Sequence, residues 1–174
     1  MNLEIIQGIS VRILELVWLM LPAYCANMAP PFVKYWKGWN PPIAGQALGS
    51  HKTVLGFVGG VGAAVVVTFI QSRIPWESRL VPYEEWLSLG LRFGIGAMAG
   101  DSLKSFVKRR IGIAPGERWI PFDQLDFVIG ALILTSSCAA LSWLDWMVIL
   151  VSSAGADVLV THMAYWLRIR DTKW

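Results

Sequence analysis

The sequence has few charged residues and few cysteines. Only 16% of its 174 residues are charged, while 55% are hydrophobic and the mean hydropathy is +0.52, so the chain is far more apolar than an ordinary water-soluble domain. Its two cysteines, Cys25 and Cys138, lie in apolar stretches, which favours small buried side chains over a disulfide or a metal site. It also lacks a basic domain of the kind that binds nucleic acid and an internal repeat. These absences favour one membrane domain over residues 1–174.

Uncharged runs predict an all-α, polytopic membrane protein with about five transmembrane helices, because each run approaches the roughly 20 residues that cross a bilayer. Arg12 is the first basic residue, so the first run is interpreted as a span rather than a signal peptide. Arg12 and Glu15 share one helical face and can pair. Gly56 and Gly60 predict close packing of the second helix. The predicted spans cover about 5–28, 53–70, 86–100, 127–144 and 146–167.

The basic residues are distributed unevenly between the two sides of this predicted topology. Arg12, Arg73 and Arg79 fall on one side and Arg92 lies within a span. The other side collects eleven, namely Lys34, Lys37, Lys52, Lys104, Lys108, Arg109, Arg110, Arg118, Arg168, Arg170 and Lys173. Because cytoplasmic loops carry an excess of Lys and Arg, we expect a multi-pass plasma-membrane protein with its N-terminus outside and its C-terminus and polar loops in the cytoplasm.

The segment 45–53 carries glycine and lysine just before the second predicted helix. Thr53 can cap this helix, and a helix start offers free N–H groups and a positive dipole end to a phosphate, with Lys52 beside it. The segment is not a P-loop, because two residues separate Gly49 from Lys52. A glycine turn followed by a lysine that reaches the membrane surface is the alternative interpretation.

The third predicted helix turns polar at Asp101 and should project beyond the bilayer. Asp101, Lys104, Ser105 and Lys108 share one face at helical spacing. A carboxylate and two ammonium groups on one face could hold a metal ion and anionic oxygens together. The alternative is a solvated basic helix end, for which the carboxylate and the serine are unnecessary.

Two carboxylates, Asp123 and Asp126, open the fourth predicted helix on one face. Proteins usually bind Mg²⁺ through one or two carboxylates together with substrate phosphates, and this pair fits that pattern. Acidic residues also favour helix N-termini for electrostatic reasons alone. The spacing by itself therefore leaves both interpretations open.

Three ionisable residues, Arg92, Asp157 and His162, lie inside predicted spans, where charge is costly. A structural Arg92–Asp157 bridge is the simplest interpretation. A small transporter or channel would use such residues on its pathway, and would be expected to concentrate polar residues near the membrane centre, often in a repeated architecture. Here the densest polar residues lie in two predicted cytoplasmic loops instead.

Two motifs stand out, Gly100-Asp101-x-x-Lys104-Ser105-x-x-Lys108-Arg109-x-x-Gly112 and Pro121-x-Asp123-x-x-Asp126. They resemble the signature of the CTP-dependent phosphatidate cytidylyltransferases, and more closely that of their short archaeal branch, the CDP-archaeol synthases. The resemblance extends to Asn27, Pro30, Pro42, Gly45, the stretch Gly49-Ser50-His51-Lys52-Thr53-x-x-Gly56 and residues 170–174. The bacterial-type signature differs, since Ile113 and Ala114 replace its Lys-Asp pair, its His-Gly-Gly is absent and Gln124 replaces its Arg.

The resemblance implies transfer of the cytidylyl group of CTP to a lipid phosphate, which yields a CDP-lipid and pyrophosphate. For the archaeal branch the acceptor is 2,3-bis-O-geranylgeranyl-sn-glycerol 1-phosphate, an isoprenoid diether. The implied cofactor is Mg²⁺, held by Asp101, Asp123 and Asp126. The implied catalytic residues are Asp101, Lys104, Lys108, Asp123 and Asp126, and the implied CTP-binding residues are Gly49, Ser50, His51, Lys52, Thr53, Ser105 and Arg109.

Two further alternatives fit the sequence less well. A CDP-alcohol phosphotransferase would continue its Asp-x-x-Asp into Gly-x-x-Ala-Arg, whereas here Phe127-Val128-Ile129-Gly130 follows Asp126. A noncatalytic scaffold would leave three clustered aspartates without a role. The expected partners are CTP, an isoprenoid lipid phosphate and the bilayer, with neither nucleic acid nor a protein partner.

Overall fold

The computed structural model describes residues 3–33, 36, 38–49, 51–75, 80–114 and 117–166, and within these ranges the chain is helical, as predicted. An isolated β-bridge joins Pro42 and Thr53. The helices are α1 (Leu3–Met28), α2 (Pro30–Val33), α3 (Gly45–Leu48), α4 (Val54–Arg73), α5 (Trp86–Arg110), α6 (Phe122–Thr135) and α7 (Trp143–Trp166), with a 3₁₀ turn, η1, at Tyr83–Glu85.

Two segments are long and apolar enough to cross a membrane, Gln7–Val33 with mean hydropathy 1.6 and Val54–Arg73 with mean hydropathy 2.0. They contain most of α1 and all of α4. The helices α5 and α7, with 25 and 24 residues, also exceed the roughly 20 residues that a span needs. The polar extension of α5 beyond Asp101 lowers its average hydropathy.

The fourth predicted span, 127–144, differs from the observed helix. α6 runs from Phe122 to Thr135 and has 14 residues, which gives a length of about 21 Å against the roughly 30 Å of a bilayer core. The helix ends where hydroxyls bond to backbone carbonyls, since Thr135 donates to Ala131 and Ser136 to Ile133. A non-helical segment then leads to α7.

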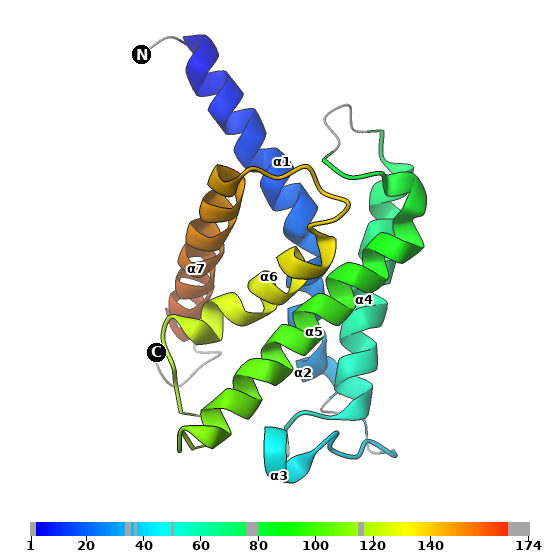
Figure 1. Ribbon diagram of the computed structural model, residues 1–174, viewed down its shortest axis with the longest axis vertical. Coiled ribbons are helices and arrows are strands. Elements are labelled where there is room, and N and C mark those ends of the chain that lie inside the picture. The colour runs from blue at the N-terminus through cyan, green and yellow to red at the C-terminus, as the bar shows by residue number, and fades with distance from the viewer. Residues whose placement is uncertain are drawn as a thin grey trace.

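α5 is the central helix of the bundle and packs against α1, α4 and α6 (Figure 1). Glycines allow these close approaches. A Cβ at Gly60 would lie 2.9 Å from the Ala26 carbonyl oxygen, and one at Gly94 would lie 2.7 Å from Val61 Cα. The predicted tight packing of the Gly56/Gly60 helix is therefore confirmed. Phe93 and Ala97 of α5 are completely buried in the apolar core.

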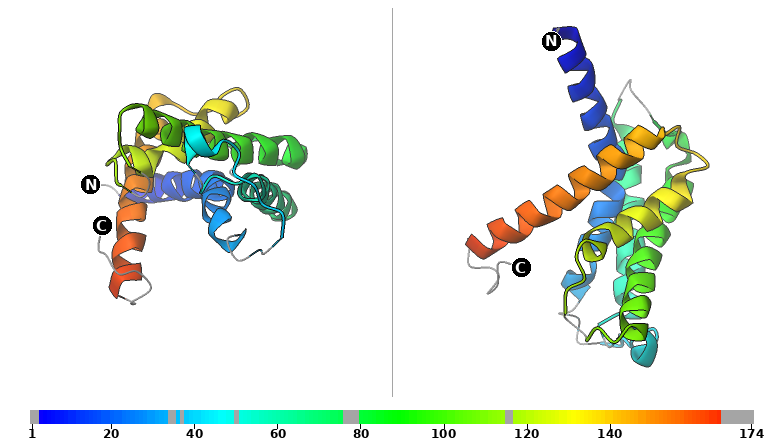
Figure 2. Two further views of the ribbon diagram at one scale, coloured as in Figure 1. Left: turned by 90° about the horizontal axis from the view of Figure 1, so that it is seen from below. Right: turned by 60° about the vertical axis from the view of Figure 1, so that its left-hand side comes forward.

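α7 is held to α1 by polar contacts. Arg12 pairs with Glu15 at 3.0 Å, as predicted, and also binds both carboxylate oxygens of Asp145 at 2.9 and 2.8 Å. Closer to the C-terminal ends of α1 and α7, the hydroxyls of Tyr24 and Ser153 lie 2.7 Å apart. Beyond these contacts α7 extends away from the other helices (Figure 2).

Candidate active site

A cluster of alternating positive and negative charges lies at the end of the bundle that contains α3 and the C-terminal end of α5 (Figure 1). Lys104 Nζ lies 3.2 Å from Asp101 Oδ1, 3.3 Å from Asp123 Oδ1 and 2.7 Å from Asp126 Oδ2. Lys52 pairs with the other oxygen of Asp101. The two motifs, which lie on α5 and at the start of α6, are thus brought together around one lysine.

Glycines at the crossing of α5 and α6 bring the two motifs together. A Cβ at Gly100 would lie 2.9 Å from the backbone carbonyl carbon of Asp126, and one at Gly96 would lie 2.8 Å from Ala131 Cα. The obstructing atoms belong to the backbone, which cannot rotate out of the way. Glycine at these positions allows the two backbones to approach this closely, and this close approach brings Asp126 near Lys104.

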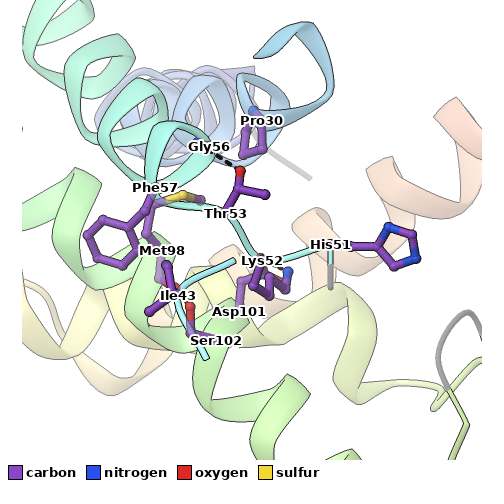
Figure 3. A pocket seen from close by; sticks show the side chains of 10 residues that line it. All are labelled: Pro30, Ile43, His51, Lys52, Thr53, Gly56, Phe57, Met98, Asp101 and Ser102. Carbon is purple, nitrogen blue, oxygen red and sulfur yellow. Dashed lines mark hydrogen bonds and ion pairs between the residues drawn. The ribbon is translucent and has the colours of Figure 1, made fainter. Parts of the chain in front are cut away.

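Lys52 reaches the cluster because its loop folds back on itself. The Ile43 amide donates to the Lys52 carbonyl at 2.8 Å, next to the bridge that joins Pro42 and Thr53. Lys52 and Asp101 lie together in the small pocket of Figure 3, whereas the exposed ring of His51 points away from them. The cavity volume is about 50 Å³, which is enough for a few water molecules but not for a nucleotide.

The start of α4 does not offer free N–H groups, contrary to the expectation from the sequence. The Val54 amide donates to the Pro41 carbonyl at 3.0 Å, the Leu55 amide to Asn40 Oδ1 at 3.1 Å and the Gly56 amide to Thr53 Oγ1 at 3.2 Å. Thr53 is the predicted N-cap, which is confirmed. Lys52 can bind a phosphate here through its charge after it separates from Asp101, but these amides are occupied.

Thr53→Ala is expected to lower the free energy of unfolding by about 1 kcal/mol, because the Gly56 amide loses its hydrogen-bond acceptor. Thermal unfolding in detergent measures the change. Thr53→Ser keeps the hydroxyl and should behave like the unmodified protein. Equal loss in both variants would show that the methyl group, and not the cap, stabilises this end of α4.

Lys108, Arg109 and Ser105 make contacts within the protein. Lys108 is buried and holds the following loop, since its ammonium contacts the Glu117 carbonyl and lies 3.1 Å from both oxygens of Asp123. Arg109 donates to the Ile113 carbonyl, and Ser105 to the Asp101 carbonyl at 2.9 Å. Lys108 therefore holds Asp123 in place.

The carboxyl groups of the cluster lie beyond the apolar parts of α5 and α6 and differ in acidity. Burial raises the pKa of Asp101, but Lys52 and Lys104 outweigh it and the net pKa is lowered. Asp123 also has a lowered pKa, because the Trp119 amide and Lys108 together outweigh its burial. Burial raises the pKa of Asp126 to about 6, an effect that Lys104 only partly offsets.

Lys104 remains charged in this setting. Burial lowers the pKa of its ammonium, but the carboxylates of Asp126 and Asp101 outweigh burial and the net pKa is raised. The side chain of Asp126 is only 6% exposed. The contact between Lys104 and Asp126 therefore lies away from solvent, where charges are weakly screened.

The donor chemistry of the three predicted metal ligands fits Mg²⁺. Oxygens of Asp101, Asp123 and Asp126 all approach one cation, the Lys104 ammonium, and carboxylate oxygen is the ligand that Mg²⁺ prefers. In the part of the chain that the structure describes, no three His, Cys, Asp or Glu side chains are placed to hold an ion as they stand. Lys104 would therefore have to leave its central position for all three to bind one ion.

The remaining predicted CTP-binding residues are placed as follows. Gly49 ends α3 with a φ of +89°, a conformation that glycine adopts readily, and the Arg109 side chain lies nearby. Ser50 lies outside the described residues.

Asn40, which holds the start of α4, was not predicted from the sequence, because no spacing rule connects an asparagine to a helix so far along the chain.

Arg92 and Asp157 do not form the predicted bridge. Arg92 donates to Ser137 Oγ at 2.6 Å and to the Leu134 carbonyl at 3.4 Å. It therefore binds the C-terminal end of α6, where cations interact favourably with exposed carbonyls. Asp157 is exposed on α7, a helix that packs against α1 and α6 rather than α5.

Comparisons with known proteins identify the family of the chain. The family model for CarS-like CDP-archaeol synthase matches residues 9–174. A CDP-archaeol synthase from Methanospirillum hungatei is 36% identical, covering 89% of this chain and 100% of the relative, and one from Archaeoglobus fulgidus is 31% identical, covering 93% and 98%.

A solved structure is also similar. It is described as an intramembrane enzyme for archaeal membrane lipids biosynthesis and is 30% identical, with a TM-score of 0.63, covering 89% of this chain and 94% of that one. This likeness and the apolar helices identify a membrane protein. The chain belongs to the CDP-archaeol synthase family.

Proposed function

We propose that the protein transfers the cytidylyl group of CTP to an isoprenoid diether glycerol phosphate and releases pyrophosphate. The observation that carries this proposal is the cluster of Lys52, Lys104, Asp101, Asp123 and Asp126 at one end of an apolar helical bundle. A polar site next to apolar helices suits a reaction between a water-soluble nucleotide and a lipid phosphate. Membership of a family named for CDP-archaeol synthesis supports the same reaction.

The reaction requires little covalent chemistry from the protein. An oxygen of the lipid phosphate attacks the α-phosphorus of CTP and forms a new P–O bond. The bond from the α-phosphorus to the oxygen that bridges to the β-phosphorus breaks, and pyrophosphate leaves with that electron pair. The second pKa of a phosphate monoester is about 6, so the nucleophile is already an anion and needs no general base.

The main barrier that side chains can lower is repulsion between two polyanions. Lys52 and Lys104 provide positive charge at the site, and positioned cations stabilise the charge that shifts to the leaving group. Both lysines are paired with carboxylates in this structure and the cavity is small. Binding of CTP therefore requires these pairs to separate, which exchanges carboxylate partners for phosphate partners.

Mg²⁺ bound by Asp101, Asp123 and Asp126 would supply additional neutralisation of the triphosphate. Lys104, which now lies between these carboxylates, would then turn towards the phosphates. Lys108 keeps Asp123 oriented while this happens, because it also holds the Glu117 carbonyl.

The proposed topology is a single domain over residues 1–174 that crosses the plasma membrane about five times and acts without a protein partner. The bias of Lys and Arg supports a cytoplasmic location for the charged cluster and the C-terminus, with the N-terminus outside. CTP is a cytoplasmic metabolite in this scheme, so the site faces its substrate.

The alternative of a small transporter or channel has no support, since the matched relatives are named as synthases.

Pyrophosphate release by the purified protein tests the proposed function. We expect release with CTP, Mg²⁺ and the isoprenoid diether phosphate, little with ATP or GTP, and loss on chelation of the metal with recovery when Mg²⁺ is restored. Folded protein that releases no pyrophosphate with any nucleotide and lipid phosphate would refute the proposal. Unchanged release after chelation would refute only the metal assignment.

A further inference from the structure

An apolar groove adjoins the charged cluster. It has a volume of about 590 Å³, within the roughly 300–1,000 Å³ typical of ligand sites. Its lining comes from α3, α4, α5, α6 and the loop before α3 and is almost entirely apolar or glycine. The one hydroxyl in the lining, that of Ser102, donates to the Met98 carbonyl at 2.7 Å.

Small residues form the floor of the groove, where two helices cross. Gly96, Gly100 and Gly130 bring the α5 and α6 backbones together there, and the exposed Ala99 adds only a methyl group to the lining. Larger apolar side chains form its rim, including Leu103 and Ile133, which are 63% and 57% exposed. A flat lipid-facing helix surface would not have this hollow.

The groove adjoins the charged pocket. Ile43, Phe57 and Ser102 line both of them, and Ser102 directly follows Asp101 in the pocket that holds Lys52. From position 106 to position 96 of α5 the groove extends about 15 Å along the helix, away from the polar end of the bundle. A molecule with an anionic head at Lys52 and an apolar tail in the groove would satisfy both environments.

We propose that this groove binds an isoprenoid chain of the lipid phosphate acceptor and thereby sets the position of its phosphate at the charged cluster. This inference rests on the proposed function and adds the site that holds the hydrocarbon. The exposed rim allows a chain to move in sideways from the bilayer. A second hollow of about 440 Å³, between α1 and α7, shares no residue with the charged pocket and contains the Arg12–Asp145 pair, so it is not assigned to the substrate.

Filling the groove tests the assignment. Ala99 is exposed and lines the groove, so Ala99→Leu adds bulk there. Ala140→Leu is the matched control, because Ala140 is also exposed but lines the other hollow. The readout is the ratio of kcat/KM for the full-length diether phosphate to kcat/KM for a short-chain diether phosphate.

We expect Ala99→Leu to lower this ratio about tenfold, as lost burial of a few methylene groups would, and Ala140→Leu to leave it unchanged. An unchanged ratio in Ala99→Leu, with normal CTP-dependent activity, would overturn the groove assignment and leave the proposed function standing. Absence of activity in the unmodified protein would instead overturn the proposed function and, with it, the identity of the occupant.

Photolabelling of the unmodified protein tests whether the groove binds an isoprenoid chain, even if Ala99→Leu loses all activity or fails to fold. A diether phosphate with a diazirine on one isoprenoid chain should label residues 96–106 and 130–134, and unlabelled lipid phosphate should compete. Labelling confined to α1 and α7, or labelling that is spread over all apolar faces and resists competition, would overturn the assignment.

Discussion

Asp126→Asn is expected to lower kcat by about 100-fold or more, the scale of losing one preorganised electrostatic group at a reacting centre. Asp126 is the carboxylate nearest to Lys104, at 2.7 Å, and its other oxygen accepts the Phe127 amide at 2.7 Å. Asparagine has nearly the same shape but no negative charge. Lys104 would then remain paired with Asp101 and Asp123, and a divalent cation would lose one of its ligands.

Asp157→Asn is the matched control for this substitution. Asp157 is exposed on α7, and its replacement should leave both kcat and the unfolding temperature unchanged. Circular dichroism and thermal unfolding of Asp126→Asn should show the native helical content. Full activity in Asp126→Asn would refute the role of Asp126, whereas loss of activity only in Asp157→Asn would point to a pathway within the membrane.

Gly130→Ala is expected to destabilise the protein by about 1–3 kcal/mol and to remove most of the activity. A Cβ at this position would lie 3.0 Å from Gly100 Cα and closer still to the Gly96 carbonyl oxygen. Both obstacles are backbone, so α5 and α6 must move apart. Asp123 and Asp126 lie on the displaced helix and would lose their contacts with Lys104.

Gly62→Ala provides the comparison for Gly130→Ala, because a Cβ at Gly62 of α4 would meet nothing within 4 Å. Alanine is favoured over glycine within a helix by about 1 kcal/mol, so Gly62→Ala should be neutral or slightly stabilising. The unfolding temperature and pyrophosphate release of both variants test this prediction. Equal behaviour of the two variants would show that close approach of α5 and α6 is not required.

Local patterns predicted local structure well. Helical spacing placed Asp101 and Lys104 on one face, paired Arg12 with Glu15 and identified Thr53 as a cap, and each of these contacts is observed. Such contacts join residues within a turn or two of one helix, so the sequence alone contains the geometry. The motif residues on α5 and α6 also meet, as the family resemblance implied.

The spacing of residues along the sequence could not predict the contacts between different helices. Arg12 pairs with Asp145, which is 133 positions away, and Asn40 holds the Leu55 amide. These contacts depend on how helices cross, and the crossing depends on which glycines face each other. The early end of α6 was also missed, and there Arg92 of another helix binds the Leu134 carbonyl.

The amides at the start of α4 are occupied, contrary to the prediction from the sequence, and this changes how the site can bind phosphate. A helix N-terminus would hold phosphate by fixed dipoles, but here the first amides bind Asn40, Pro41 and Thr53. The Lys52 ammonium is then the cation that can bind phosphate at this pocket. Its four-carbon side chain is flexible, so phosphate binding can be coupled to separation of the Lys52–Asp101 pair.

The most direct test of the account follows the oxygen atoms of the acceptor. A diether phosphate labelled with ¹⁸O in its non-bridging oxygens is incubated with CTP, Mg²⁺ and the protein, and both products are analysed by mass spectrometry. Attack by the lipid phosphate on the α-phosphorus predicts a CDP-lipid that retains all of the label and pyrophosphate that contains none. Label in the pyrophosphate, or the absence of a CDP-lipid with folded protein, would contradict the account.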